Sequence, residues 1–128
     1  MAIAAVLASI AYPTFKDQLA RARRADAIVA LNMAQMAQER WRANRTTYGA
    51  LAEIGVDSIS SAGHYTLQVT ASSANGYTIL ATARGVQDLD ADCRNLSVGM
   101  AGANFVYASG PDATVGNAAT INRRCWSL

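Results

Sequence analysis

No glycine precedes Gly49, and the whole chain holds only two prolines, two cysteines and one histidine. Without glycine, the first third of the sequence lacks the commonest interruption of a helix. With one histidine and no closely spaced cysteine pair, the chain is a poor candidate for binding zinc. We therefore expect a long helix at the start and no metal site.

Charge is also scarce, because charged residues make up 16% of the 128 residues and apolar residues 52%. This composition excludes a disordered polypeptide and predicts one folded domain, residues 1–128, with some apolar surface left for a partner. The net charge of +2 is too small to predict a general affinity for nucleic acid. Local basic patches can still form where arginines gather.

Residues 1–45 read as one long helix made of alanine, leucine, methionine, glutamine and arginine. In its second half, apolar residues recur at helical spacing, and we expect this stripe to pack on the rest of the fold. The stripe comprises Ala22, Ala25, Val29, Met33 and Met36, widened by Ile28 and Leu31. Its flanks, which include Arg23 and Arg24, should face water.

The beginning of this helix differs, because residues 2–11 are apolar on every side apart from Ser9. Such a segment must be surrounded rather than covered on one side. The whole apolar run of about 12 residues would reach only about 18 Å, which is shorter than a hydrocarbon core of about 30 Å. Pro13 predicts a bend or a local loosening nearby.

After the helix, residues 46–63 form a connecting loop rich in glycine, serine, threonine and asparagine. The alternation in HYTLQVT and in YTILATA, with a turn ending in Asn75 and Gly76, predicts a hairpin. A weaker alternation surrounds Leu96 and Val98, a short strand is expected at residues 104–108, and a last extended piece should carry Cys125 and Trp126. The fold class is therefore α+β: a long N-terminal helix packed on an antiparallel sheet of three or four strands drawn from residues 64–128.

The two cysteines, Cys93 and Cys125, are best explained by a disulfide bond. A closed loop of about 33 residues would contribute roughly 3 to 4 kcal/mol in the chain-entropy treatment. The bond implies an oxidising compartment, whereas two reduced and buried thiols in a cytosolic protein are the alternative. If the bond forms, it closes a C-terminal loop.

No set of residues in the sequence points to catalysis. His64 has no nucleophile or carboxylate pattern around it, and no glycine-rich phosphate loop has the required spacing. The acidic run DLDAD, residues 88–92, reads as a solvated turn rather than a calcium site. We expect no enzyme activity, no catalytic residue, no cofactor and no small-molecule substrate.

Three arginines adjoin the cysteines: Arg94 follows Cys93, and Arg123 and Arg124 precede Cys125. A disulfide would gather their guanidinium groups into a candidate phosphate-contacting patch for DNA. Three aspartates of the acidic run lie beside it and would offset the field; they are Asp88, Asp90 and Asp92.

The order of these features resembles the type IV pilin family over essentially the whole chain. The similarity is carried by the apolar run ending in SIAYP, the following TFKDQLARARRADAIVAL, the helix end AQERWRANRTTY, the strands YTLQVT and YTILATA, and the tail with DADC and CW. Within the family, the chain looks most like minor pilins of the group that contains the DNA-uptake pilins. Family members begin with a basic leader, a glycine and an FTLIE-like start whose glutamate docks subunits, and we expect that segment to lie upstream of Met1.

The resemblance implies a structural minor pilin that supports pilus assembly and twitching motility, adhesion or DNA uptake. Its partners would be other pilin subunits, the inner membrane before assembly, and DNA. The globular part would be periplasmic or extracellular, and the subunit would end in the extracellular pilus of a bacterium. The N-terminal helix would be buried in lipid before assembly and among neighbouring subunits afterwards. The residues that would make these contacts are Ile3, Val6, Leu7, Ile10 and Pro13.

Two other functions come from the same resemblance. A DNA-binding receptor pilin for natural transformation predicts salt-sensitive binding through Arg94, Arg123 and Arg124. A pseudopilin of a type II secretion system predicts a C-terminal loop held by calcium in place of a disulfide.

Overall fold

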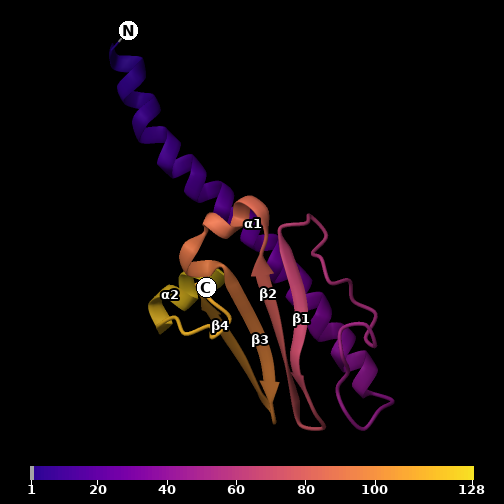
Figure 1. Ribbon diagram of the computed structural model, residues 1–128. Coiled ribbons are helices and arrows are strands. Elements are labelled where there is room, and N and C mark those ends of the chain that lie inside the picture. The colour runs from indigo at the N-terminus through magenta and orange to yellow at the C-terminus, as the bar shows by residue number, and fades with distance from the viewer. Residues whose placement is uncertain (1) are drawn as a thin grey trace.

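The computed structural model describes the backbone of residues 2–128 and the side chains of residues 15–128. A long helix precedes a four-stranded sheet, and a short helix follows it (Figure 1). The elements are α1 (Ala2–Arg42), β1 (Tyr65–Ser72), β2 (Gly76–Ala83), the 3₁₀ turns η1 (Gly85–Leu89) and η2 (Ala91–Cys93), β3 (Asn95–Ala101), β4 (Asn104–Gly110) and α2 (Ala119–Trp126).

Five of the positions expected in a membrane or filament core, Ile3, Val6, Leu7, Ile10 and Pro13, lie outside the residues whose side chains are described. Across the part of the chain that the structure describes, no helix has both the length and the apolar character needed to cross a membrane.

The sheet is antiparallel throughout, with the strands in the order β1-β2-β3-β4. The predicted hairpin is confirmed: Tyr65 and Leu67 are buried on the face of β1 that also holds Val69. Gly76 begins β2 where the backbone of β3 approaches closely, since a Cβ at this position would lie 1.9 Å from the Met100 carbonyl oxygen. The predicted α+β architecture is therefore correct, with four strands.

The helix packs on the sheet through only the part of the expected stripe that Ile28 and Leu31 widen, since Leu31 is in the core and Ile28 packs against it. Ala27, Leu31 and Ala34 are fully buried against the sheet, whereas Val29, Met33 and Met36 are each more than half exposed. Small side chains face the sheet because they let the two layers approach, so the bulkier apolar residues are left on the outer side. The prediction that the stripe of Ala22, Ala25, Val29, Met33 and Met36 would be covered is wrong within this chain.

A buried amide fastens the end of α1 to the loop that follows. Gln38 donates from Nε2 to the Gly49 carbonyl at 2.8 Å and accepts from the Gly49 N–H at 3.0 Å. Tyr48, the residue before Gly49, packs edge-on against Tyr77 of β2 with ring centroids 4.8 Å apart. The helix stops at Arg42, slightly before the expected position 45, because turn-type hydrogen bonds close its last residues.

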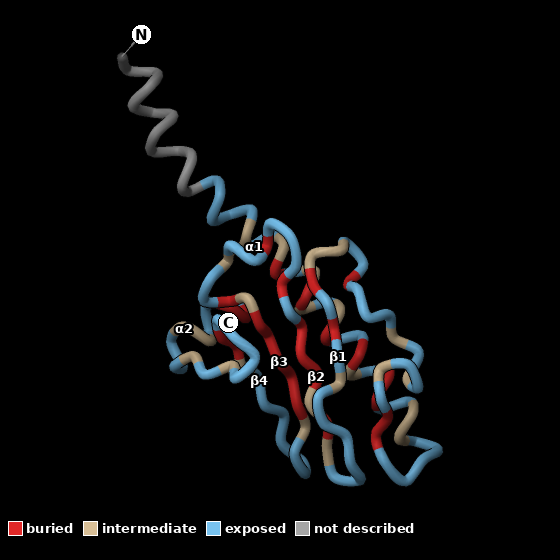
Figure 2. Tube along the Cα trace, viewed as in Figure 1, coloured by how far each residue is buried: buried red, intermediate tan, exposed pale blue. Residues whose placement is uncertain are grey.

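The C-terminal segment is helical, which corrects the expected extended piece around Cys125 and Trp126. In α2, Ile121 and Cys125 are one helical turn apart, and both pack against the core. A spacing of four residues is that of a helix and not of an extended strand. Trp126 is buried, donates from Nε1 to the Ala108 carbonyl at 2.9 Å, and packs against Tyr107 of β4. Burial is concentrated in β2, β3 and the sheet-facing side of α1 (Figure 2).

β4 is an edge strand that α2 covers only in part, at Tyr107 and Ala108, whose carbonyls accept hydrogen bonds from Asn122 and Trp126. Its residues Phe105, Val106 and Tyr107 are 41 to 53% exposed. None of the four strands contains a charged residue. The basic groups of the described chain must therefore lie on the helices, turns and loops.

Candidate nucleic-acid interface

The disulfide predicted from the two cysteines is present and joins η2 to α2. The Cys93 and Cys125 sulfurs are 2.02 Å apart and the two Cα atoms 5.4 Å apart. Asn117 supports the junction by donating to the Asp92 carbonyl at 2.8 Å and to the Ser109 hydroxyl at 2.9 Å. The bond therefore holds the acidic run beside the arginines of α2.

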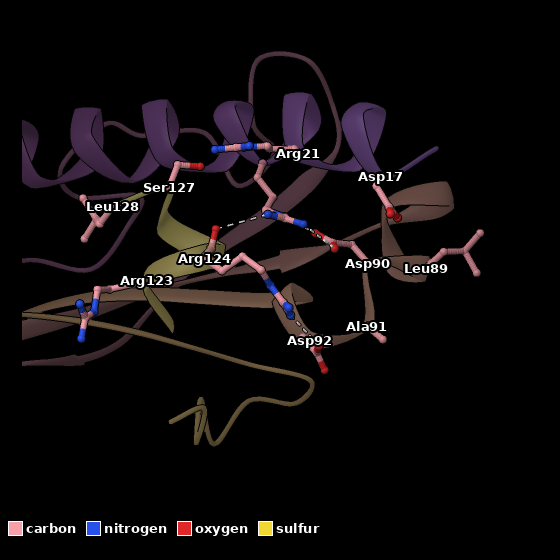
Figure 3. Close-up of a pocket in the computed structure, with 11 residues that line it drawn as sticks. Asp17, Arg21, Leu89, Asp90, Ala91, Asp92, Arg123, Arg124, Ser127 and Leu128 are labelled. Carbon is pink, nitrogen blue, oxygen red and sulfur yellow. Dashed lines mark hydrogen bonds and ion pairs between the residues drawn. The ribbon is translucent and has the colours of Figure 1, made fainter. Parts of the chain in front are cut away.

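Beside the disulfide lies a cavity of about 640 Å³ between α1, the two 3₁₀ turns and α2 (Figure 3). Arginines from two helices line it together with aspartates of the acidic run. The charged lining residues are Asp17, Arg21, Arg24, Asp90, Asp92, Arg123 and Arg124. Four arginines thus line one cavity, where arginines from α1 and α2 come together.

Each aspartate of the acidic run pairs with one arginine. Asp90 accepts two hydrogen bonds from Arg24, at 2.6 and 3.0 Å, and both side chains are only 10% exposed. Asp92 pairs with Arg124 at 2.8 Å, and Asp88 with Arg94 at 3.6 Å; both of these pairs are open to solvent. The acidic run is thus not simply a solvated turn, and Arg24 is not on a wet face as the sequence predicted.

Gln87 positions the acidic run against α1. Its buried Nε2 donates to the Ala20 carbonyl at 3.0 Å, to the Tyr65 hydroxyl at 2.9 Å and to the Asp90 carboxylate at 3.2 Å. Burial raises the pKa of Tyr65 to about 12, so its hydroxyl stays protonated and neutral. The Gln87 amide, the neutral Tyr65 hydroxyl and the Asp90 carboxylate together fix the point at which the acidic run crosses the helix.

The structure brings together two of the three arginines predicted for DNA contact. Arg123 and Arg124 line the cavity, whereas Arg94 does not, because its guanidinium donates to the Asp88 carbonyl at 2.6 Å. Arg21 of α1 joins them. Its spacing of three from Arg24 placed both on one side of the helix and could have revealed this.

Arg21 and Arg123 are exposed, and neither has a carboxylate within salt-bridge distance in the described chain. Their guanidinium groups are therefore free to bind an anion at the mouth of the cavity. A phosphate diester is the anion whose geometry a guanidinium matches with two parallel hydrogen bonds.

Other chemistry has little support among the side chains that the structure describes. No group of three or more histidine, cysteine or acidic residues is placed to hold a metal ion in residues 15–128. His64 lies beside Arg23 and Arg84, and its backbone N–H donates to Asp26 at 3.2 Å. Ser61 and Asp26 line a second pocket with His64, and the Asp26 carboxylate is held by hydrogen bonds from the Ser60 hydroxyl and the His64 N–H.

Comparison with known families gives one result for this sequence. A family model described as type IV minor pilin ComP, DNA uptake sequence receptor, matches residues 13–97. The matched segment covers the second part of the long helix, the hairpin and the acidic run, and it ends before α2. No curated protein matches the chain.

Proposed function

Because the chain belongs to the family of the type IV minor pilin ComP, the DNA uptake sequence receptor, we propose that it is a minor pilin subunit that binds DNA during uptake. The observation that carries the proposal is that Arg21 of α1 and Arg123 of α2 line one cavity next to the disulfide. These two arginines offer guanidinium groups that no carboxylate of the described chain neutralises.

Arg94 and Arg124 would add to this surface by exchanging partners. Their ion pairs with Asp88 and Asp92 are solvent-exposed, and such pairs contribute only about 0 to 1 kcal/mol each. A DNA phosphate can therefore replace the aspartate at little cost. Arg24 cannot do the same, because its pair with Asp90 is buried and fixed by two hydrogen bonds.

The outer side of α1 supports a structural role within a filament. Val29, Met33 and Met36 form an apolar row that nothing in the described chain covers. A neighbouring subunit is the partner that would bury this row after the N-terminal helix leaves the inner membrane. The subunit would then belong to an extracellular pilus.

The DNA proposal is tested by fluorescence anisotropy with labelled duplex DNA over a range of salt concentrations. The test variant combines Arg21→Ala, Arg123→Ala and Arg124→Ala, the exposed arginines that line the cavity. The matched control combines Arg40→Ala, Arg42→Ala and Arg45→Ala, which removes the same charge at the far end of α1. Each lost phosphate contact should lower the slope of log affinity against log salt by about 0.9.

We expect the test variant to lose two or three such contacts, with affinity at low salt falling at least tenfold and the control changing much less. Equal losses in both variants would mean that only net charge matters and would refute this interface. Failure of the unaltered chain to bind duplex DNA would refute the DNA-binding function itself.

A further inference from the structure

The turn η1 crosses α1 at the end of the globular part from which the helix projects (Figure 1). We call η1, residues Gly85–Leu89, the collar. Gln87 turns inward and fixes the collar to the Ala20 carbonyl at 3.0 Å. The residues on either side of Gln87 are therefore held at a constant level along the helix.

The collar presents two aliphatic side chains to solvent. Val86 is 64% exposed and Leu89 65% exposed. They are three residues apart in a 3₁₀ turn, so both point to the same side of it. Two apolar side chains fixed on a turn that could equally carry polar residues indicate a contact that the described chain does not itself provide.

Basic side chains flank both aliphatic residues. Val86 shares a pocket of about 300 Å³ with Arg23, His64 and Arg84, and no carboxylate lines this pocket. On the other flank Leu89 lies near Arg21 and Asp17. Asp26 is one turn of α1 beyond Arg23, where its oxygens accept hydrogen bonds from Ser60 and from the Ala62 and His64 N–H groups.

The Val86 side of the collar, where Arg23 and Arg84 lie and no carboxylate lines the pocket, is complementary to an anionic lipid surface. Toward Leu89 the collar also carries Asp88, whose charge is offset by its ion pair with Arg94. The level of the collar agrees, because Ala20 lies eight residues beyond Tyr12, where the apolar run ends. That is about 12 Å along the helix, and less above the membrane plane once the helix tilts. Headgroup layers are roughly 5 to 7 Å thick, so arginine side chains at this level reach the lipid phosphates.

We propose that the collar docks the globular domain onto anionic phospholipid headgroups before assembly, with Val86 and Leu89 in the interfacial layer and Arg23 and Arg84 on lipid phosphates. The inference rests on the proposed insertion of the N-terminal helix in the inner membrane. It assigns to the collar a role that is separate from the DNA-binding arginines Arg94, Arg123 and Arg124.

The test uses the full chain reconstituted in two kinds of vesicle, phosphatidylcholine alone and phosphatidylcholine with phosphatidylglycerol. Backbone hydrogen exchange of residues 84–90 is measured in both and in detergent micelles. We expect exchange to slow about tenfold in the anionic vesicles only, since each arginine near such a surface contributes about a fivefold change in binding.

Two variants are compared with a matched control. Val86→Ser with Leu89→Ser, and Arg23→Ala with Arg84→Ala, should each remove the protection. Ile59→Ser with Val106→Ser removes two similarly exposed aliphatic residues elsewhere and should leave it unchanged.

Equal exchange in anionic vesicles, neutral vesicles and micelles would overturn the proposal while leaving membrane insertion intact. Protection that grows with the density of chains in neutral vesicles would also overturn it, because the collar would then be covered by a second copy. A chain carrying the segment expected upstream of Met1 that still fails to enter any vesicle would instead refute the membrane stage of the proposed function, and the collar proposal with it.

Discussion

At the scale of single residues, Arg24 joins three elements at the end of the domain from which α1 projects. It reaches from α1 to Asp90 through two hydrogen bonds, and it also approaches the Arg124 carbonyl at 3.5 Å. One guanidinium thereby links the helix, the acidic run and α2.

Replacing Arg24 with alanine should lower the free energy of unfolding by about 3 kcal/mol, because it leaves the buried Asp90 carboxylate without its partner. Urea unfolding followed by circular dichroism measures the change. Arg94→Ala, which breaks the exposed pair with Asp88, is the control and should cost less than about 1 kcal/mol. Similar values for the two variants would contradict a special role for the buried pair.

Asp26 gives the domain a sensitivity to acid. Burial alone would raise its pKa, but hydrogen bonds from Ser60 and from the Ala62 and His64 N–H groups outweigh burial, so the pKa lies below its ordinary value. A carboxylate with a lowered pKa contributes stability above its unfolded pKa and loses it as the pH falls through its folded pKa. The affected window is below about pH 4.

Asp26→Asn should therefore reduce stability at neutral pH and flatten the acid side of the stability profile. Unfolding measured from pH 2 to 7, roughly spanning the ordinary carboxylate range, tests this. An Asn variant with an acid limb as steep as that of the unaltered chain would show that other carboxylates control acid unfolding.

Residue-level prediction from the sequence succeeded where one residue type has one dominant use, and failed where partners are distant in the chain. The pairing of Cys93 with Cys125 followed from there being only two cysteines. The pairing of Arg24 with Asp90 spans 66 positions, and no local pattern announces it. Arg24 was consequently assigned to the solvent.

At the scale of elements, α2 depends on the disulfide and on one aromatic anchor. The helix has only eight residues, which is too short to be stable alone in water. Cys125 ties it to η2, and Trp126 fills the space beside β4. Its backbone hydrogen bonds should therefore be among the first to open when either tie is lost.

Reduction of the Cys93–Cys125 bond should lower the free energy of unfolding by about 3 to 4 kcal/mol, since the unfolded chain regains the freedom of the closed loop. Hydrogen exchange of residues 119–126 should accelerate before that of β2 and β3. Chemical denaturation with and without reductant measures the first effect, and mass spectrometry of exchanged peptides measures the second. An unchanged unfolding midpoint after confirmed reduction would contradict it.

The elements with a clear period were predictable, and those defined by tertiary context were not. Alternation located β1 and β2 to within a few residues, and the absence of glycine located α1. The side of α1 that faces the sheet was not predictable from hydrophobicity alone. Ala27 and Ala34 lie on that side because their small side chains allow the helix to approach the sheet closely. The eight residues of α2 form only two helical turns, which is too short a segment to show a helical period in the sequence.

At the scale of the whole molecule, α1 divides the surface into a side that packs within the chain and a side reserved for partners. The sheet covers Ala27, Leu31 and Ala34, and the opposite side keeps Val29, Met33 and Met36 exposed. This division is what a subunit of a helical assembly requires, since its long helix must contact its own sheet and its neighbours at once.

Met33→Glu should leave the isolated fold unchanged to within about 0.5 kcal/mol, because the side chain is already exposed. The same change should exclude the subunit from filaments, because a carboxylate would be buried among apolar neighbours. The amount of subunit in sheared pilus fractions, relative to that in whole cells, measures incorporation. Gln68→Glu, an equal gain of charge on exposed β1, is the control, and equal incorporation of both variants would contradict the assignment.

The uncharged edge of β4 has a consequence for handling the protein. Natural sheets discourage edge-to-edge pairing with lysine, proline or inward charges, and residues 104–108 carry none of these while exposing Phe105, Val106 and Tyr107. Concentrated samples should therefore form thioflavin-binding aggregates by strand addition, and Val106→Lys should delay their onset severalfold at equal stability. In an assembly the same edge would be protected wherever a neighbouring chain lies against Phe105 and Val106.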